Sequence, residues 1–258
     1  MSKYFFFDID GTLTSVNDHT KVSTSTLKAL KQLEENGHFV ALATGRAHFR
    51  AKLFADSIGI SNMVCEGGNG LYINGELVHY EPLNQDYAHA ICAEALAKKI
   101  PMAIALEDSP IRYSQNNEFN EKAGLFADFM EVRINSELDY QKETTIRRIF
   151  LALTPDEENQ LSSITEIGVM RYNDKFLIIE PDDKYKGIKQ MMKILEADEK
   201  EVVVFGDGLN DRKMFKEAPF KIAMGNAVTE LKELADYVTS DSDSDGIANA
   251  LLHFGWIE

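Results

Sequence analysis

The sequence predicts an α/β fold in which a doubly wound parallel sheet forms the core and an α+β domain is inserted into it. Continuous apolar runs, such as "FFF" at 5–7, "FVALA" at 39–43 and "VVVF" at 202–205, are typical of strands buried on both faces. Helical patterns separate these runs near both ends of the chain, as in a parallel sheet covered by helices. The middle of the chain instead combines paired strands with helices, which indicates a separate, antiparallel unit.

Strand and helix signals alternate along the first eighty residues. The helix expected over 22–35 has Ser23 or Thr24 as its N-cap. Asn74-Gly75 lies between two apolar runs and is a strong type I′ hairpin signal. The expected elements are a strand at 3–8, a helix at 22–35, a strand at 38–44, a helix at 47–58, a strand at 62–66 and a hairpin at 71–80.

The last seventy residues return to the same alternation. The run "EVVVFGD" at 201–207 is a buried strand that ends in an aspartate. The expected elements are a helix at 187–196, the strand at 201–207, a short helix from 210, a strand at 220–225, a helix at 228–235, a strand at 237–240 and a helix from 246.

Residues 83–182 are expected to form the inserted domain, and residues 1–82 and 183–258 the core. Pro82 and Pro181 bracket this stretch. Its strands and helices predict an antiparallel sheet with helices on one face. The expected elements are a helix at 85–99, strands at 102–108 and 111–115, a helix at 118–130, a strand at 145–153, a helix from 155 to 164 and a hairpin at 167–180.

Composition narrows the class of partner. The 258 residues carry 27 basic and 42 acidic side chains, a formal charge of −15. Nucleic acids and anionic membranes attract basic surfaces, so neither is an expected partner. The two cysteines have no metal-ligand or disulfide spacing, and no segment reaches the roughly 18 apolar residues of a membrane span. We therefore expect a cytoplasmic protein, with its oligomeric state open between monomer and dimer.

Residues suited to chemistry follow the predicted core strands or begin the helices. Parallel strands end at one edge of a sheet, and ligands bind there at the topological switch point. We therefore expect these residues to lie together. They are Asp8-Ile9-Asp10-Gly11-Thr12, Thr44-Gly45-Arg46, Lys186-Gly187 and "GDGLND" at 206–211.

Asp8, Asp10, Asp207 and Asp211 would then converge. Two carboxylates about 4 Å apart repel by roughly 4 kcal/mol at an effective dielectric constant near 20, so four of them need cations nearby. Oxygen ligands without His or Cys indicate a hard ion, and Mg²⁺ fits best. Lys186 would supply a second positive charge. A carboxylate, a divalent ion, a lysine and a hydroxyl-plus-amide cradle are the parts of phosphoryl transfer through an aspartyl-phosphate.

These motifs carry a family resemblance. In order and spacing, Asp8-x-Asp10-Gly-Thr-Leu, Thr44-Gly, Lys186 and Gly206-Asp207-Gly-x-Asn210-Asp211 resemble the four motifs of the haloacid dehalogenase superfamily. The chain is most similar to the Cof-type branch of sugar-phosphate phosphatases, whose cap lies between the second and third motifs. The resemblance implies a Rossmann-like core, a specificity-determining cap at 83–182, and Mg²⁺-dependent hydrolysis of small phosphomonoesters such as sugar phosphates.

The resemblance also implies roles for individual residues. Asp8 would be the nucleophile and Asp10 the general acid and base. Thr44 would hydrogen-bond the phosphoryl group, and Lys186 would neutralise its charge. The implied metal site consists of Asp8, the backbone carbonyl of Asp10 and Asp207, with Asp211 next to these ligands. The substrate-binding residues would be Thr44, Gly45, Arg46, Asn69 and Asn210.

Two other functions share these motifs. A phosphomannomutase-like hexose phosphomutase has similar motifs and a similar cap, but needs a bisphosphate activator and releases little phosphate. A catalytically silent binding protein would share the fold, although Asp8, Asp10 and Lys186 are all present. Specificity depends on cap loops, so the sequence does not identify the substrate.

Overall fold

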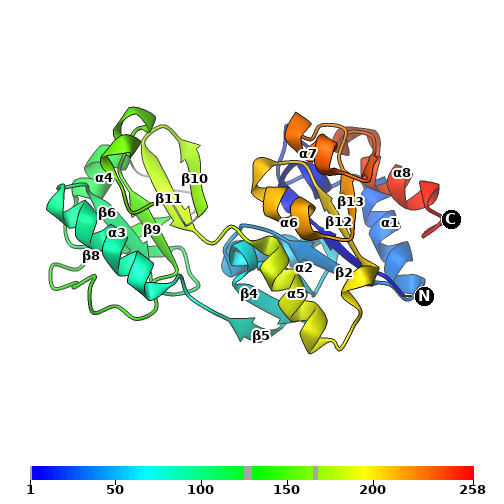
Figure 1. Ribbon diagram of the computed structural model, residues 1–258, viewed down its shortest axis with the longest axis horizontal. Helices are drawn as coiled ribbons and strands as arrows, with labels where there is room; N and C mark the ends of the chain where they lie inside the picture. Colours follow the sequence, from blue (N-terminus) through cyan, green and yellow to red (C-terminus); the bar gives the residue numbers. More distant parts are fainter. Residues whose placement is uncertain (1, 125–129, 165–167) are drawn as a thin grey trace. The chain divides into compact units, whose positions relative to one another are not determined.

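The structure is a computed structural model that describes residues 2–124, 130–164 and 168–258. Its internal contacts divide the chain into two units (Figure 1). The core unit joins the residues up to Tyr80 to Asp183–Glu258, and the inserted unit is Glu81–Asp182. We expected the first boundary after Pro82, and the contacts place it two residues earlier.

Among the described residues, the core unit contains one eight-stranded sheet with the order β14-β13-β12-β1-β2-β3-β4-β5. The pairs from β14 to β3 are parallel, and β4 and β5 add an antiparallel hairpin at one edge. This confirms the predicted parallel sheet. The strands are β1 (Tyr4–Phe7), β2 (Phe39–Ala43), β3 (Met63–Cys65), β4 (Gly70–Ile73), β5 (Glu76–Tyr80), β12 (Val202–Gly206), β13 (Phe220–Ala223) and β14 (Tyr237–Val238).

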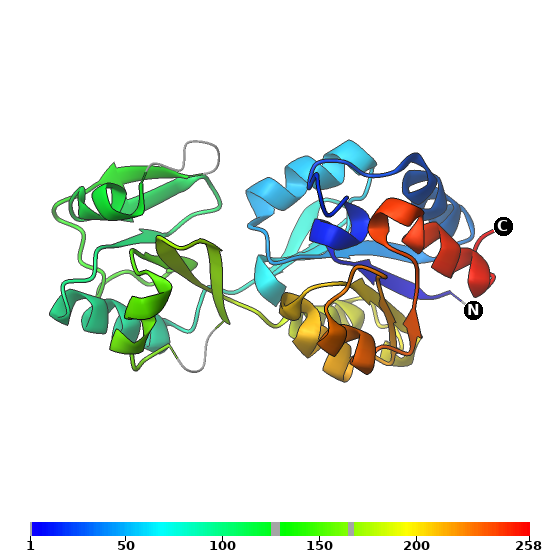
Figure 2. The ribbon, with the colours of Figure 1, turned by 90° about the horizontal axis from the view of Figure 1, so that it is seen from above.

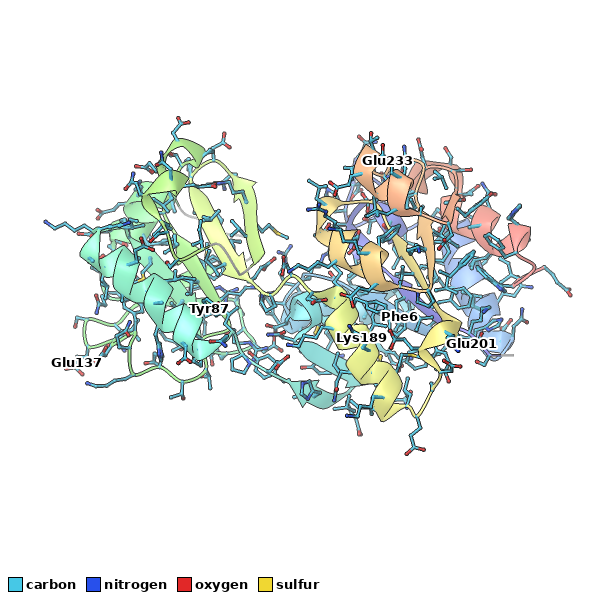
Figure 3. The ribbon with its side chains drawn as sticks, viewed as in Figure 1. Phe6, Tyr87, Glu137, Lys189, Glu201 and Glu233 are labelled. Carbon is cyan, nitrogen blue, oxygen red and sulfur yellow. The ribbon has the colours of Figure 1, made fainter. Side chains whose placement is uncertain are left out.

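Helices cover both faces of this sheet (Figure 2). Phe5 and Phe7 pack with α1, α2 and α8 on one face, whereas Phe6 packs with α5, α6 and α7 on the other. Figure 3 shows Phe6 inside the core unit and Glu233 at its surface. The helices are α1 (Thr24–Glu35), α2 (His48–Ile58), α5 (Lys184–Ile194), α6 (Arg212–Glu217), α7 (Thr229–Leu234) and α8 (Gly246–His253).

Helix α5 begins earlier than predicted. We expected a helix over 187–196, but its first residue is Lys184. The carboxylate of Asp183 accepts a hydrogen bond of 2.9 Å from the backbone N–H of Lys186 and caps the helix. Ser23, one of the two residues predicted as the N-cap of α1, caps it in the same way by accepting from the N–H of Thr26.

The inserted unit has a six-stranded sheet among its described residues, with the order β10-β11-β9-β6-β7-β8. Its strands are β6 (Met102–Ala105), β7 (Ile111–Ser114), β8 (Glu131–Ile134), β9 (Arg148–Leu151), β10 (Gly168–Asn173) and β11 (Phe176–Glu180). All neighbours are antiparallel except β7 and β8. We did not predict β8, a short strand of four residues that is largely exposed.

Helices lie on both faces of this second sheet, and our expectation of one covered face was wrong. Helix α3 (Gln85–Ala97) packs against the face that carries Ile149, and α4 (Glu118–Ala123) against the face that carries Phe150. The helix predicted over 118–130 ends at Ala123, with 125–129 outside the described residues. The segment 155–164 contributes only a 3-10 helix, Pro155–Gln160.

None of the helices in the described parts of either unit is long and apolar enough to cross a bilayer.

Candidate active site

Three carboxylates meet at the carboxyl ends of the central strands. Asp8 follows β1, Asp207 follows β12, and Asp211 ends the short helical turn Leu209–Asp211. The parallel register pairs Phe7 with Phe205, which brings the two strand ends together. One oxygen from each carboxylate lies within 4.8 Å of the others. The predicted convergence of these three aspartates is therefore present.

A buried lysine bridges two of them, and it is Lys184. Its Nζ lies 2.6 Å from Asp8 Oδ1 and 2.6 Å from Asp211 Oδ1, and its side chain is 1% exposed. We expected Lys186 in this place, but Lys186 is exposed. The two lysines are two positions apart, about 200° around a helix, so only one can face the carboxylates.

A sequence signal for Lys184 existed. Buried residues of α5 recur with helical spacing at Ile188, Met191 and Met192. Lys184 lies four, seven and eight positions before them and so continues the same stripe. Lys186 lies outside this stripe. Placing the helix start at residue 187 hid the pattern.

Burial dominates the electrostatics of this cluster. Burial and the neighbouring Asp211 raise the pKa of Asp8 well above its usual value, although Lys184 acts in the opposite direction. Burial raises the pKa of Asp207 to about 6, against the hydrogen bond from Thr12. Burial disfavours the charged form of Lys184, but Asp211 and Asp8 outweigh it and raise the pKa of this lysine. When all three are ionised, the carboxylates share one ammonium group, and the raised pKa values of Asp8 and Asp207 reflect the cost of that charge.

The loop after β12 is held by Asp211. Its Oδ2 accepts hydrogen bonds from the backbone N–H groups of Asp207 (3.1 Å) and Gly208 (3.2 Å). Thr12 Oγ1 donates to Asp207 Oδ1 at 2.7 Å. Gly11 has φ +84°, and a Cβ there would lie 2.3 Å from Asp207 Oδ2. A glycine is therefore required where the two loops meet.

Two supporting residues were not assigned roles from the sequence. One is Thr12, whose hydroxyl orients Asp207. The other is Asn226, whose Nδ2 donates to the carbonyl of Gly11 at 2.8 Å and whose Oδ1 accepts from the N–H of Ser242. The Thr12–Asp207 and Asn226–Gly11 contacts join segments more than 190 residues apart, so no local pattern could reveal them.

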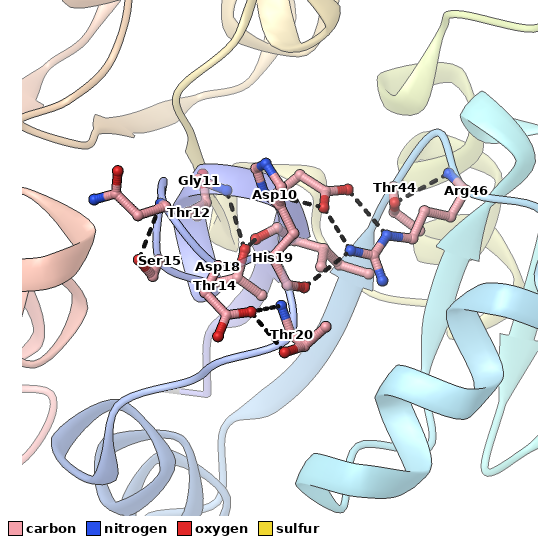
Figure 4. Close-up of polar contacts among 12 residues, drawn as sticks. Asp10, Gly11, Thr12, Thr14, Ser15, Asp18, His19, Thr20, Thr44 and Arg46 are labelled. Carbon is pink, nitrogen blue, oxygen red and sulfur yellow. Dashed lines mark hydrogen bonds and ion pairs between the residues drawn. The ribbon is translucent and has the colours of Figure 1, made fainter. Parts of the chain in front are cut away.

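We expected Asp10 to converge with the other three aspartates, but its carboxylate lies outside their cluster. Its carboxylate forms two hydrogen bonds with the guanidinium group of Arg46, as Figure 4 shows. Nδ1 of His19 lies 3.5 Å from Asp10 Oδ1. The structure therefore places Arg46 beside Asp10, in contact with an acidic side chain, and its substrate contact stays a prediction.

The remaining predicted residues differ in burial. Thr44 is buried at the end of β2, and its Oγ1 accepts from the backbone N–H of Arg46 at 3.1 Å. The turn Glu66–Gly68 binds this strand end, because Gly67 N–H donates to the carbonyl of Thr44 at 3.1 Å. Asn69 follows this turn and is buried, whereas Asn210 is exposed on the loop after β12. Gly45 is half-buried beside Thr44.

The turn Glu66–Gly68 also packs tightly against the start of α5. A Cβ on Gly68 would lie 2.0 Å from the carbonyl oxygen of Asp183. A Cβ on Gly187 would lie 2.6 Å from the carbonyl oxygen of Gly68. The segment that holds the backbone of Thr44 therefore also fixes the helix turn that carries Lys184.

The donor set fits a hard divalent cation. The three clustered ligand groups are all carboxylates, two of them fully buried, and they outnumber the one ammonium group beside them. Oxygen-only ligands with surplus negative charge are the chemistry that Mg²⁺ prefers. Asp8 and Asp207 have the positions to hold such an ion. Asp211 is already engaged through both oxygens by Lys184 and by two backbone N–H groups.

Comparison with known proteins agrees with the family resemblance of the sequence motifs. Residues 5–251 match the model of the haloacid dehalogenase-like hydrolase family. YkrA of Bacillus subtilis, named as a candidate phosphatase, is 32% identical over 262 residues, which cover 100% of this chain and 99% of that protein.

Solved structures show the same similarity. A protein of Geobacillus kaustophilus without an assigned function is 30% identical, with a TM-score of 0.84 and 100% coverage of both chains. A sugar phosphatase described as HAD subclass IIB is 28% identical, with a TM-score of 0.78 and coverage of 99% of this chain and 100% of that one.

Proposed function

The chain belongs to the haloacid dehalogenase-like hydrolases and is a phosphoric monoester hydrolase, and from this we propose that it hydrolyses small phosphomonoesters with Mg²⁺ through an aspartyl-phosphate. The observation that carries the proposal is the buried ammonium group of Lys184 between Asp8 and Asp211, with Asp207 beside them. A nucleophilic carboxylate and fixed positive charge are the requirements of this chemistry.

Asp8 is the proposed nucleophile. A carboxylate oxygen of Asp8 attacks phosphorus, and the bond between phosphorus and the leaving alcohol oxygen breaks. Lys184 holds Asp8 Oδ1 at 2.6 Å, which fixes the orientation of the carboxylate and places positive charge where the phosphoryl oxygens gather. In this proposal Lys184 takes the role that the sequence assigned to Lys186.

Asp10 is the proposed general acid and base. It gives a proton to the departing alcohol oxygen, then takes a proton from the water that attacks the aspartyl-phosphate. The second step releases inorganic phosphate and restores Asp8 and protonated Asp10. The hydroxyl of Thr44 is proposed to hydrogen-bond a phosphoryl oxygen during both steps.

Mg²⁺ is the proposed cofactor. Asp8, Asp207 and the carbonyl of Asp10 would be its ligands. Asp211 would support the site indirectly, because it holds Lys184 and the loop at 207–208. When bound, the ion would supply positive charge to the phosphoryl oxygens and offset the surplus carboxylate charge.

Sugar phosphates are the proposed substrate class. The support is the similarity to the HAD subclass IIB sugar phosphatase, at 28% identity over nearly the whole chain. The unit Glu81–Asp182 is the proposed cap that determines specificity. Within this unit, Arg148 and Glu180 form a buried ion pair at 2.8 Å.

A panel of phosphorylated metabolites tests the proposal. Phosphate release is measured from sugar phosphates, flavin mononucleotide, pyridoxal phosphate and an aryl phosphate, with Mg²⁺ or with a chelator. We expect release that depends on Mg²⁺. No release from any compound would refute the proposal, and isomerisation of a hexose phosphate that needs a bisphosphate activator would favour a mutase. Asp8→Asn protein from the same preparation controls for contaminating phosphatases.

A further inference from the structure

The side chain of Asp10 lies in a clamp formed by one arginine (Figure 4). Arg46 Nε donates to Asp10 Oδ2 at 2.9 Å, and Arg46 Nη2 donates to Asp10 Oδ1 at 2.5 Å. One planar group thus engages both oxygens of the carboxylate. A bidentate contact of this kind fixes the plane of a carboxylate as well as its distance.

Arg46 is itself held on several sides. Its side chain is 13% exposed, and its guanidinium carbon lies 5.3 Å from the ring centroid of Phe54. Nη2 also donates to the carbonyl of His19 at 3.4 Å. The backbone N–H of Arg46 donates to Thr44 Oγ1. The guanidinium group therefore has one well-defined orientation from which to hold Asp10.

We propose that Arg46 is a positioning residue for proton transfer, and that it acts by fixing the carboxyl group of Asp10 rather than by binding substrate. This inference rests on the proposed role of Asp10 as general acid and base. Each carboxylate oxygen has two acceptor sites. Arg46 occupies one site on each oxygen and leaves the other for the proton that Asp10 passes.

The contact with Arg46 restricts rotation of the Asp10 carboxylate. Asp10 follows Asp8 by two residues, and its side chain is 43% exposed. An exposed carboxylate would rotate among several orientations, whereas proton transfer needs heavy atoms within about 2.6–3.2 Å and aligned. A lysine could supply the charge at residue 46 but not the planar fork. The positioning role therefore predicts that charge alone is insufficient.

Leaving groups of different basicity distinguish this role from substrate binding. Nitrophenolate departs without protonation, whereas an alkyl alkoxide needs a proton from the general acid. We expect Arg46→Met to lower kcat/KM for an alkyl phosphomonoester by about 100-fold, the lower end of general-acid contributions. For nitrophenyl phosphate we expect a loss of less than about fivefold, because that transition state requires little proton transfer. Arg46→Lys should retain the same selective defect in weaker form.

Two further variants complete the design. Asp10→Asn should show the same selectivity for leaving group, and the double variant with Arg46→Met should lose no more than Asp10→Asn alone, because both changes remove one function. Arg212 forms an ion pair with Glu230 on the surface of the same unit. Arg212→Met is the matched control and should leave both rates unchanged.

The outcomes separate the two proposals. Equal losses on both substrates, or a raised KM at unchanged kcat, would overturn the positioning role and leave the phosphatase proposal standing. Failure of the unmodified protein to hydrolyse either compound would overturn the phosphatase proposal itself. If Arg46→Met does not fold, as judged by circular dichroism, the ratio of the two rates in Arg46→Lys decides, and an unchanged ratio overturns the inference.

Discussion

Replacing Lys184 and Lys186 separately by methionine provides the sharpest test of the site. The two lysines lie two positions apart in the same helix, but Lys184 is buried against Asp8 and Asp211 whereas Lys186 is exposed. Methionine keeps most of the side-chain volume and removes the charge. The comparison therefore isolates what the ammonium group does at each place.

The structure gives the expected magnitude. Each Lys184–aspartate contact of 2.6 Å is an attraction of about 6 kcal/mol at an effective dielectric constant of 20. Most of this offsets the cost of burying the charges, and breaking a buried pair leaves a net loss of about 3–5 kcal/mol. Lys184→Met should lower the free energy of unfolding by that amount in the absence of divalent ions. Lys186→Met should change it by less than about 0.5 kcal/mol, as surface substitutions usually do.

Two assays read the result. Urea unfolding in a chelator measures stability, and phosphate release with Mg²⁺ measures kcat/KM at a temperature where both variants are folded. Lys184→Met should lose at least about 100-fold in kcat/KM, the usual effect of removing one group that stabilises transition-state charge. If Lys184→Met keeps wild-type activity, or if Lys186→Met is the more damaging change, the assignment of Lys184 is wrong.

Three other changes have defined outcomes. Asp8→Asn should abolish phosphate release while the protein still unfolds cooperatively, and substantial residual turnover would exclude Asp8 as the nucleophile. Gly11→Ala should weaken activation by Mg²⁺, measured as the ion concentration that gives half-maximal rate, because the added Cβ meets Asp207 Oδ2 and φ is +84°; an unchanged value would contradict the close approach. Glu94 is partly buried, but hydrogen bonds from Lys98, Ser163 and Ser162 outweigh burial and lower its pKa. A lowered folded pKa contributes stability that is fully present at pH values above the unfolded pKa of about 4.3 and is lost as pH falls through the folded pKa. Glu94→Gln should therefore lower the free energy of unfolding by about 1.5–3 kcal/mol at pH 7 and by progressively less under acid, as urea titrations would show.

The sequence alone predicted the core because its signals there are local. Continuous apolar runs define β1 and β12, and Asp8 and Asp207 follow them directly. The ends of parallel strands must meet, so convergence needed no tertiary information. A local turn signal predicted the hairpin at Asn74-Gly75, where β4 and β5 turn.

The errors arose where a side chain far away, or a cap, decides the outcome. The start of α5 depends on a hydrogen bond to Asp183, and moving it by three residues exchanges Lys186 for Lys184. Strand β8 is short and exposed, and only its parallel pairing with β7 defines it. The sequence also did not show that Arg46 pairs with Asp10, because the two residues lie 36 positions apart.

The position of Asp183 has a consequence for exchanging parts between proteins of this kind. The chain leaves the inserted unit at Asp182, caps α5 at Asp183 and reaches Lys184 in the next residue. One residue added or removed after the cap would turn the helix by about 100° relative to the strands. The cap at Asp183 and the first turn of α5 are therefore the part of the junction in which chain length matters. A chimera that grafts a foreign unit should keep its seam before Asp183, because Asp183 caps α5 and so sets the angular register of Lys184.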